Sequence, residues 1–147
     1  DLARLLPQSR AVPIVDALMN ATDLKLIDIE PLIAANPGVR GVHRARSALA
    51  LVDGGAESPQ ESRLRLALVA GGLPSPETQI QFFNEYGEAF IRVDMGWRQW
   101  RVAVEYDGVQ HVVTVRADDF EGRKIGAVVG VDAYAKALTF FDGSAVP

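Results

Sequence analysis

The sequence predicts an α/β domain, with a small mixed sheet flanked by helices and a helical segment before it. Helical spacing of apolar residues dominates residues 1–55. A Ser-x-x-Glu capping box at Ser58 and Glu61 then begins a further helix, which ends at Gly71-Gly72. After that helix the apolar period changes to that of strands, in three runs with short links. Short links favour antiparallel neighbours, so the runs predict a meander.

The helical segment divides at its turn signals. We predict helices over residues 9–20, 29–35 and 39–52. Asp28 is the expected N-cap of the second helix, with Pro31 in its first turn, and the Asn-Pro-Gly of residues 36–38 ends it. The predicted apolar stripe of the first helix consists of Ile14, Val15, Leu18 and Met19.

Three strands are expected to follow the capped helix. They cover Thr78 to Phe83, Ala89 to Met95 and Trp100 to Tyr106, with turns at residues 84–87 and 96–99.

The sequence pattern that predicts helices and strands weakens after His111. Residues 112–116 and 125–131 are candidate strands, and Asp132 is a candidate cap for a last helix through Leu138.

The composition is that of a globular chain. Its 147 residues favour one compact domain, and 48% are hydrophobic, enough for a substantial core. Cysteine is absent, which excludes disulfides and thiolate chemistry and fits a cytoplasmic protein. No apolar run reaches the length of a membrane helix and no signal pattern opens the chain, so we expect no membrane partner. The first residue is Asp1 rather than Met, as expected of a fragment or a trimmed chain.

The net charge of −4 argues against a generic, strongly basic nucleic-acid binder. The positive charge is nevertheless clustered. One interpretation is a basic rim around an acidic pocket, and the other is a set of ordinary solvated side chains. The clusters are Arg40, His43, Arg44 and Arg46, then Arg63 and Arg65, then Arg92, Arg98 and Arg101.

Two carboxylates in the predicted strands are the main chemical candidates. Alternation places Asp94 and Glu105 opposite the apolar side chains of their strands. A two-residue loop would pair Asp94 with Ala103 and leave Glu105 as the diagonal neighbour, roughly 7–8 Å away between backbones. Two like charges on one face need an opposing charge, which Mg²⁺ (or Mn²⁺) supplies through oxygen ligands. Such a site suits phosphodiester hydrolysis.

Each candidate also has a structural interpretation. For Glu61 it is the capping box alone, which spacing favours, and for Asp94 it is an acid at the end of a hairpin. For Asp107-Gly108 it is an ordinary turn, and for His111 it is a half-buried strand position. Glu105 is the exception, because a glutamate within an apolar strand requires a partner.

Motifs for other site chemistries are missing. The sequence contains no GxxxxGK[ST] loop, no HExxH, no Cys/His zinc pattern and no GxSxG.

The succession "AESPQESRLRLALVAGGLPSPETQIQ", "VDMGW" and "RVAVEYDGVQH" resembles an actinobacterial group related to the very-short-patch-repair (Vsr) endonucleases. These belong to the restriction-endonuclease-like PD-(D/E)xK superfamily. The resemblance covers about Asp53 to His111. The preceding helices resemble a linker that often follows a winged-helix domain of AbiEi-type antitoxins. The resemblance therefore implies a helical lead-in over 1–55 and a restriction-endonuclease-like domain over 56–147.

The resemblance also implies residue roles. Asp94 and Glu105 would hold Mg²⁺ or Mn²⁺, and Glu61 would orient the site or a bound water. The family's ExDGxxH pattern falls on Glu105, Asp107, Gly108 and His111. The wider superfamily has a catalytic lysine where Asp107 stands, and in the Vsr branch histidines share that role. His111 is therefore the candidate base or phosphate ligand.

The chain departs from the family after about residue 116, where the family's Arg/Asp-rich helix and Gly-Trp strand are not recognisable. We therefore expect an atypical or truncated end to the domain. The expected function is metal-dependent cleavage of DNA. The alternative is a catalytically inactive nuclease fold that binds DNA or protein within a toxin–antitoxin or defence system.

Overall fold

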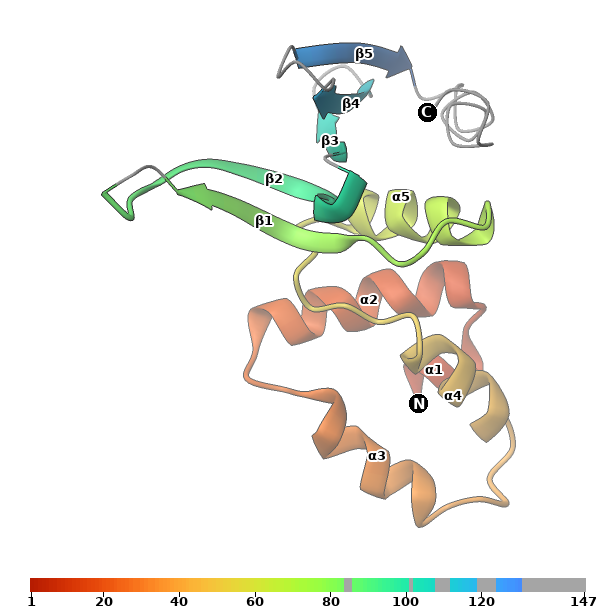
Figure 1. The fold of residues 1–147 in the computed structure, drawn as a ribbon. Coiled ribbons are helices and arrows are strands. Elements are labelled where there is room, and N and C mark those ends of the chain that lie inside the picture. Colours follow the sequence, from red (N-terminus) through yellow and green to blue (C-terminus); the bar gives the residue numbers. More distant parts are fainter. Residues whose placement is uncertain (84–85, 101, 108–111, 119–123, 131–147) are drawn as a thin grey trace. The chain divides into compact units, whose positions relative to one another are not determined.

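The computed structural model describes residues 1–83, 86–100, 102–107, 112–118 and 124–130. Helices precede strands along the chain (Figure 1). The helices are α1 (Leu2–Leu5), α2 (Gln8–Ala21), α3 (Leu26–Ala34), α4 (Val42–Leu49) and α5 (Pro59–Ala70). The strands are β1 (Glu77–Phe83), β2 (Ala89–Trp97), β3 (Val102–Asp107), β4 (Val112–Asp118) and β5 (Lys124–Gly130), with a 3₁₀ turn at Arg98–Trp100.

The chain forms two compact units, Asp1–Leu66 and Ala67–Pro147. The division falls inside α5, whereas the resemblance places the start of the nuclease-like domain at residue 56. Each unit is described by itself below.

Small residues build the core of the first unit. Ala11 and Val12 of α2 and Ala48 of α4 are fully buried. Partly buried apolar side chains pack around them, namely Ala3, Leu6, Leu51, Val52 and Leu66. The predicted stripe of α2 was therefore partly wrong, since Ile14 is 43% exposed and Leu18 is 44% exposed. The buried face of α2 consists of Ala11, Val12, Pro13, Val15 and Asp16, and α1 and α4 both contact this helix.

A buried ion pair joins α2 to α5 within this unit. Arg65 Nη2 donates to Asp16 Oδ2 at 2.7 Å, and both side chains are almost fully buried. The other carboxylate oxygen, Asp16 Oδ1, accepts the backbone N–H of Asp53, and Arg65 Nη1 donates to the Leu51 carbonyl. The linker between α4 and α5 is thereby fixed at two points.

Two predicted helix starts were wrong. The helix α3 begins earlier than predicted, so Asp28 occupies its third position, where Oδ2 accepts the N–H of Lys25 at 2.9 Å. The helix α4 begins only at Val42, because Gly41 takes a left-handed φ of 85° and interrupts the predicted helix over residues 39–52.

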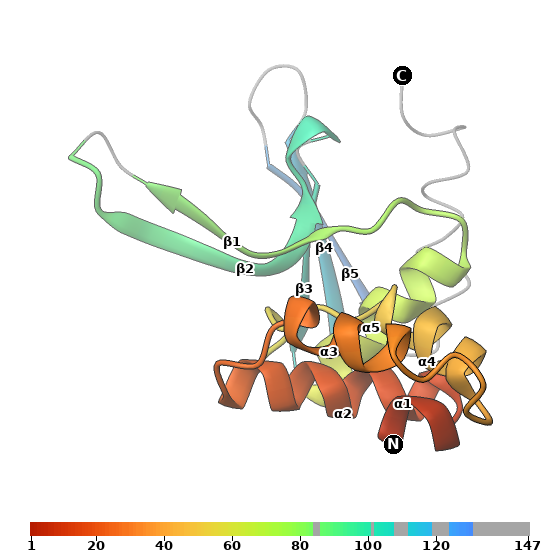
Figure 2. The same ribbon diagram turned by 90° about the horizontal axis from the view of Figure 1, so that it is seen from below.

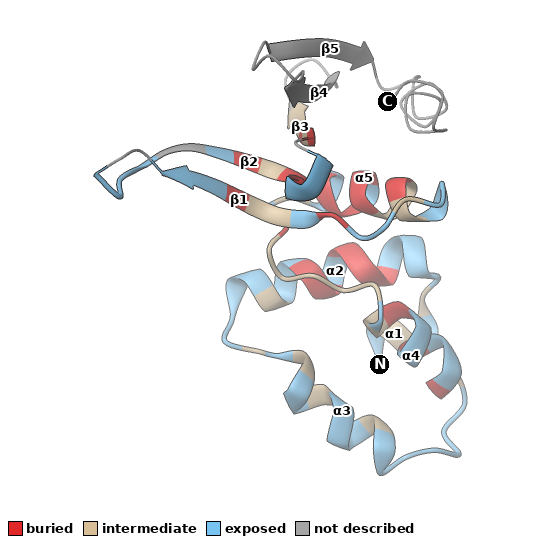
Figure 3. Cartoon of the chain, viewed as in Figure 1, coloured by how far each residue is buried: buried red, intermediate tan, exposed pale blue. Residues whose placement is uncertain are grey.

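The helix α3 is strongly apolar in sequence but has no buried residue. Figure 3 shows it in exposed and intermediate colours along its whole length. Ile27 is 73% exposed and Leu32 is 66% exposed.

The capping box that starts α5 is confirmed. Glu61 N–H donates to Ser58 Oγ at 3.2 Å, and Ser58 Oγ donates to Glu61 Oε1 at 2.7 Å. Glu61 Oε2 accepts the N–H of Glu57 at 2.9 Å.

The second unit contains an antiparallel meander in the order β1-β2-β3-β4-β5 (Figure 2). The predicted three-strand meander is present, and the candidate runs after His111 become β4 and β5. All four pairings of the described strands are antiparallel, so the mixed sheet of the prediction is not found there. The predicted helix from Asp132 to Leu138 lies outside the described residues.

The predicted turn at residues 96–99 was also wrong in its first half. Gly96 and Trp97 continue β2, and a side chain at Gly96 would collide with the Val102 carbonyl of β3. Trp97 is 2% exposed and its Nε1 donates to the Pro74 carbonyl at 3.0 Å. The close approach of β3 thus requires a glycine within the strand.

None of the helices in the described ranges combines the length and apolar character needed to cross a membrane.

Candidate functional site

The two faces of the β2–β3 pair differ in burial. Gly96 pairs with Ala103, so strand alternation places Asp94 and Glu105 on one face. Both residues are partly exposed. The other face is buried and carries Val93, Met95, Trp97, Val102 and Val104. The register of β2 and β3 therefore places the two carboxylates on the same face, as predicted.

The predicted register was wrong by two residues. Asp94 does not pair with Ala103, because Gly96 takes that position after the extension of β2 to Trp97. The β2–β3 ladder consists of Met95 with Val104, Gly96 with Ala103, and Trp97 with Val102. The ladder ends at Met95 with Val104, so Asp94 and Glu105 are the first residues beyond its end, whereas the prediction had made them diagonal neighbours within it.

Asp94 lies where β2 leaves β3. Its Oδ2 accepts the backbone N–H of Tyr106 at 2.7 Å. The side chain thus replaces a strand carbonyl as acceptor at the end of the ladder. One oxygen of the carboxylate therefore has a structural partner in β3.

Gln79 of β1 is the neighbour of Asp94 on the other side. The flanking pairs are Thr78 with Met95 and Ile80 with Val93, so the constant register places Gln79 across from Asp94. Gln79 has a φ of 51°, which is uncommon for a residue other than glycine within a strand. Sequence reasoning missed this position, because nothing in its strand pattern marks a left-handed glutamine.

The arrangement suits a hard cation better than a soft one. Carboxylate oxygens from Asp94 and Glu105 are the ligands that Mg²⁺ prefers, and Mg²⁺ commonly takes only one or two carboxylates and keeps several waters. Among the residues that the structure describes, no three Asp, Glu or His side chains are grouped so that they could hold a metal together. Within the described part of the sheet, Asp94 and Glu105 would therefore be the only carboxylate ligands of a cation at this position.

The remaining predicted site residues fall elsewhere. Glu61 is buried in the first unit, where its carboxylate oxygens bond to Ser58 and Glu57. Asp107 is the last residue of β3. Gly108 and His111 lie outside the described residues.

The predicted arginine clusters differ in burial and in their surroundings. Arg65 is buried against Asp16 and is not part of a surface cluster. Arg98 pairs with Glu77 at 2.8 Å and lies 5.8 Å from the centre of the Phe82 ring. Arg92, Arg63 and the group at residues 40–46 are exposed, and Arg101 lies outside the described residues.

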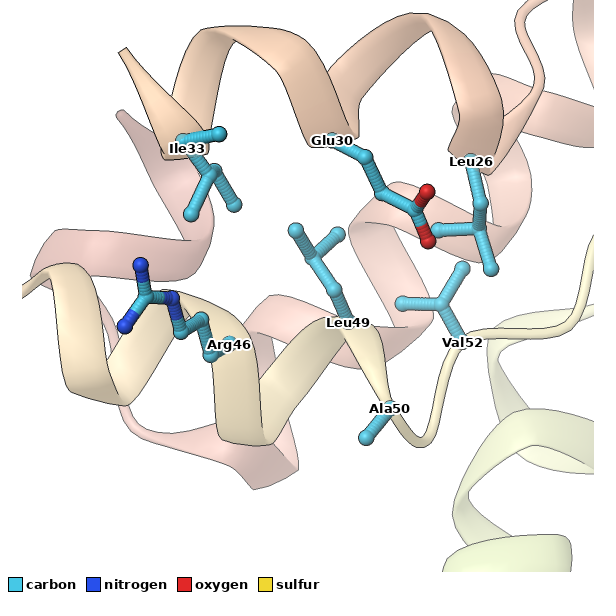
Figure 4. Close-up of a pocket in the computed structure, with 8 residues that line it drawn as sticks. Leu26, Glu30, Ile33, Arg46, Leu49, Ala50 and Val52 are labelled. Atoms are coloured by element: carbon cyan, nitrogen blue, oxygen red, sulfur yellow. The ribbon is translucent and has the colours of Figure 1, made fainter. Parts of the chain in front are cut away.

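A groove of about 390 Å³ lies between α3 and α4 in the first unit (Figure 4). Leu26 and Ile33 of α3 face Leu49 of α4 across it, and Glu30 and Arg46 are its charged lining residues. Its volume is within the range of small-ligand pockets, about 300–1,000 Å³. None of the predicted catalytic residues lines it.

Two relatives were found among curated proteins, one from each of two strains of Mycobacterium tuberculosis, and both are described as uncharacterised. Each is 37% identical over 110 residues, which is 75% of this chain. The chain spans about 40% of the length of these relatives. No family model matches the chain. No solved structure matches it either.

Proposed function

We propose that the second unit is a metal-dependent nuclease-like domain that acts on DNA. The observation that carries this proposal is that Asp94 and Glu105 lie on the face opposite the buried one and directly follow the last pair of the β2–β3 ladder, Met95 with Val104. The resemblance to Vsr-like endonucleases assigns the metal to the same two residues. Two partly exposed carboxylates on one face repel each other when they come close, and a cation between them would offset this repulsion, which supports the assignment.

The roles of the chain's own groups follow from this placement. Asp94 and Glu105 would hold Mg²⁺ or Mn²⁺, which supplies positive charge to a phosphate and lowers the pKa of a bound water. The Tyr106 N–H holds one oxygen of Asp94, so the other oxygen is the one that a cation would use. By resemblance, His111 would accept a proton or contact the phosphate, since Asp107 replaces the lysine of the wider superfamily.

The second candidate function is a catalytically inactive module that binds DNA or protein. The hydrogen bond from Tyr106 to Asp94 favours it, because this contact gives Asp94 a structural reason to be present without any metal. The replacement of the superfamily lysine by Asp107 points the same way.

Cleavage of supercoiled plasmid in Mg²⁺ or Mn²⁺ separates the two functions. The nuclease proposal predicts nicking that EDTA abolishes and that Glu105→Gln reduces by at least about a hundredfold, the loss expected when a metal ligand disappears. Glu88→Gln is the matched control, since it removes an exposed carboxylate from the loop between β1 and β2. DNA binding without nicking by the unaltered chain would support the inactive module instead.

A further inference from the structure

The charge of the chain is unevenly distributed around α4. The chain carries a net charge of −4, yet the stretch from Pro31 to Val52 contains three arginines, one histidine and no acidic residue. These four residues are Arg40, His43, Arg44 and Arg46. This segment therefore carries a net positive charge, although the chain as a whole is acidic.

The fold turns this positive charge toward solvent. Val42, Ala45 and Ala48 are buried and define the inner face of α4. The outer arc is formed by His43, Arg44, Arg46 and Ser47, all of which are exposed, and Arg40 is exposed just before the helix. Because Arg44 and Arg46 are two residues apart, they are separated by about 160° around the helix and lie at the two edges of the outer arc, with His43 and Ser47 between them. We call Arg40, His43, Arg44 and Arg46 the α4 basic face.

Within the described residues, the arginines of this face differ from several others in having no acidic partner. Arg4, Arg65 and Arg98 all form ion pairs, with Asp1, Asp16 and Glu77. In the part of the chain that the structure describes, Arg40, Arg44 and Arg46 form no ion pair. Arg44 Nη1 has only a long contact of 3.5 Å to the Leu5 carbonyl. The guanidinium groups therefore remain available to an external anion.

The composition of the face favours nucleic acid over a protein partner. A stable protein interface usually centres on apolar or aromatic anchors, and the four residues of the face include none. Interfaces with DNA are more polar and strongly positive. The planar fork of arginine also matches two phosphate oxygens at once. Apolar side chains gather instead in the groove beside α3, where Arg46 stands at the α4 wall (Figure 4).

We propose that the α4 basic face binds the phosphate backbone of nucleic acid. The contact positions the chain on a duplex without reading its sequence, because phosphates carry no sequence information. It requires neither the cation site of the sheet nor cleavage, so it stands apart from the proposed nuclease function.

Fluorescence anisotropy with a labelled DNA duplex, in EDTA over a series of salt concentrations, tests the proposal. The probe variant is Arg44→Gln with Arg46→Gln. The charge-matched control is Arg10→Gln with Arg63→Gln, two exposed arginines of the same unit. Circular dichroism verifies that both variants fold.

The proposal predicts that the probe variant lowers the slope of log affinity against log salt by about 2, since each phosphate contact contributes about 0.9. It also predicts at least tenfold weaker binding at low salt for the probe variant, and less than twofold for the control. Equal weakening by both variants would overturn the proposal, because it would reflect net charge alone. So would no duplex binding by the unaltered chain, or tighter binding to polyglutamate or anionic vesicles than to DNA. EDTA keeps a failure of the cation site from affecting these results.

Discussion

The Oδ2 atom of Asp94 accepts the backbone N–H of Tyr106 at 2.7 Å, at the point where β2 separates from β3. The last backbone pair before the separation is Met95 with Val104. One side chain thus closes the end of the ladder through one oxygen, which leaves its second oxygen for the cation of the proposed site. Stability and cation binding can therefore be separated at Asp94 by the choice of substitution.

Asp94→Ala should destabilise the chain more than Asp94→Asn does. The alanine leaves the Tyr106 N–H without its acceptor, which costs about 1–3 kcal/mol, whereas the amide oxygen of asparagine can still accept it. Urea unfolding followed by circular dichroism measures the difference. Equal stability of the two variants would show that the hydrogen bond contributes little.

Gly96→Ala should destabilise the sheet by about 1–3 kcal/mol, the cost of forcing an added group into a packed site. The added methyl group would meet the Val102 carbonyl, which belongs to the paired backbone and cannot move without breaking the ladder. Gly38→Ala is the matched control, since nothing lies within 4 Å of a side chain there. Thermal unfolding should therefore separate the two alanine variants, and a neutral Gly96→Ala would contradict the close approach.

Asp16→Ala should cost about 3–5 kcal/mol of unfolding free energy, since it leaves the buried Arg65 guanidinium without its counter-ion. The double variant Asp16→Leu with Arg65→Met should be less damaging than the single one, because it buries no unpaired charge. A complete double-mutant cycle by urea unfolding gives the coupling energy. A coupling near zero would mean that the ion pair does not hold α2 to α5.

Ser58→Ala should cost about 0.5–2 kcal/mol through loss of the N-cap of α5. Glu61→Ala should also destabilise, because Glu61 accepts hydrogen bonds from both Ser58 and Glu57. Glu61→Gln retains an acceptor oxygen and should lie between Glu61→Ala and the unaltered chain in thermal unfolding. An unchanged melting temperature in Glu61→Ala would remove the capping box as the structural role of this residue.

Local signals predicted much of the secondary structure. The Ser58–Glu61 capping box and the presence of three strands were predicted correctly, because caps and strand periods depend on neighbouring residues. The predicted start of the third strand was wrong, since Trp100 belongs to the 3₁₀ turn before β3. The start of α4 was missed because Gly41, which interrupts it, looks in sequence like an ordinary glycine. The role of Gly96 was missed because only the approach of β3 shows why it stands within a strand.

Sequence reasoning predicted the candidate site less well than it predicted the strands that carry the site. Alternation placed Asp94 and Glu105 on one face, but the pairing was displaced by two residues because β2 continues through Trp97. The Tyr106 bond to Asp94 and the left-handed Gln79 depend on how three strands meet, which no local pattern encodes. Arg65 looked like a surface cation, and its burial follows from Asp16, which lies 49 residues away in sequence.

Calorimetric titration with Mn²⁺ and Mg²⁺ tests the central claim most directly, that Asp94 and Glu105 form a cation site. It compares the unaltered chain with the double variant Asp94→Asn and Glu105→Gln, which preserves side-chain size and hydrogen-bond acceptors. The proposed site predicts binding of one cation by the unaltered chain and its loss in the double variant, with both chains folded. No binding by the unaltered chain, or equal binding by both, would contradict it.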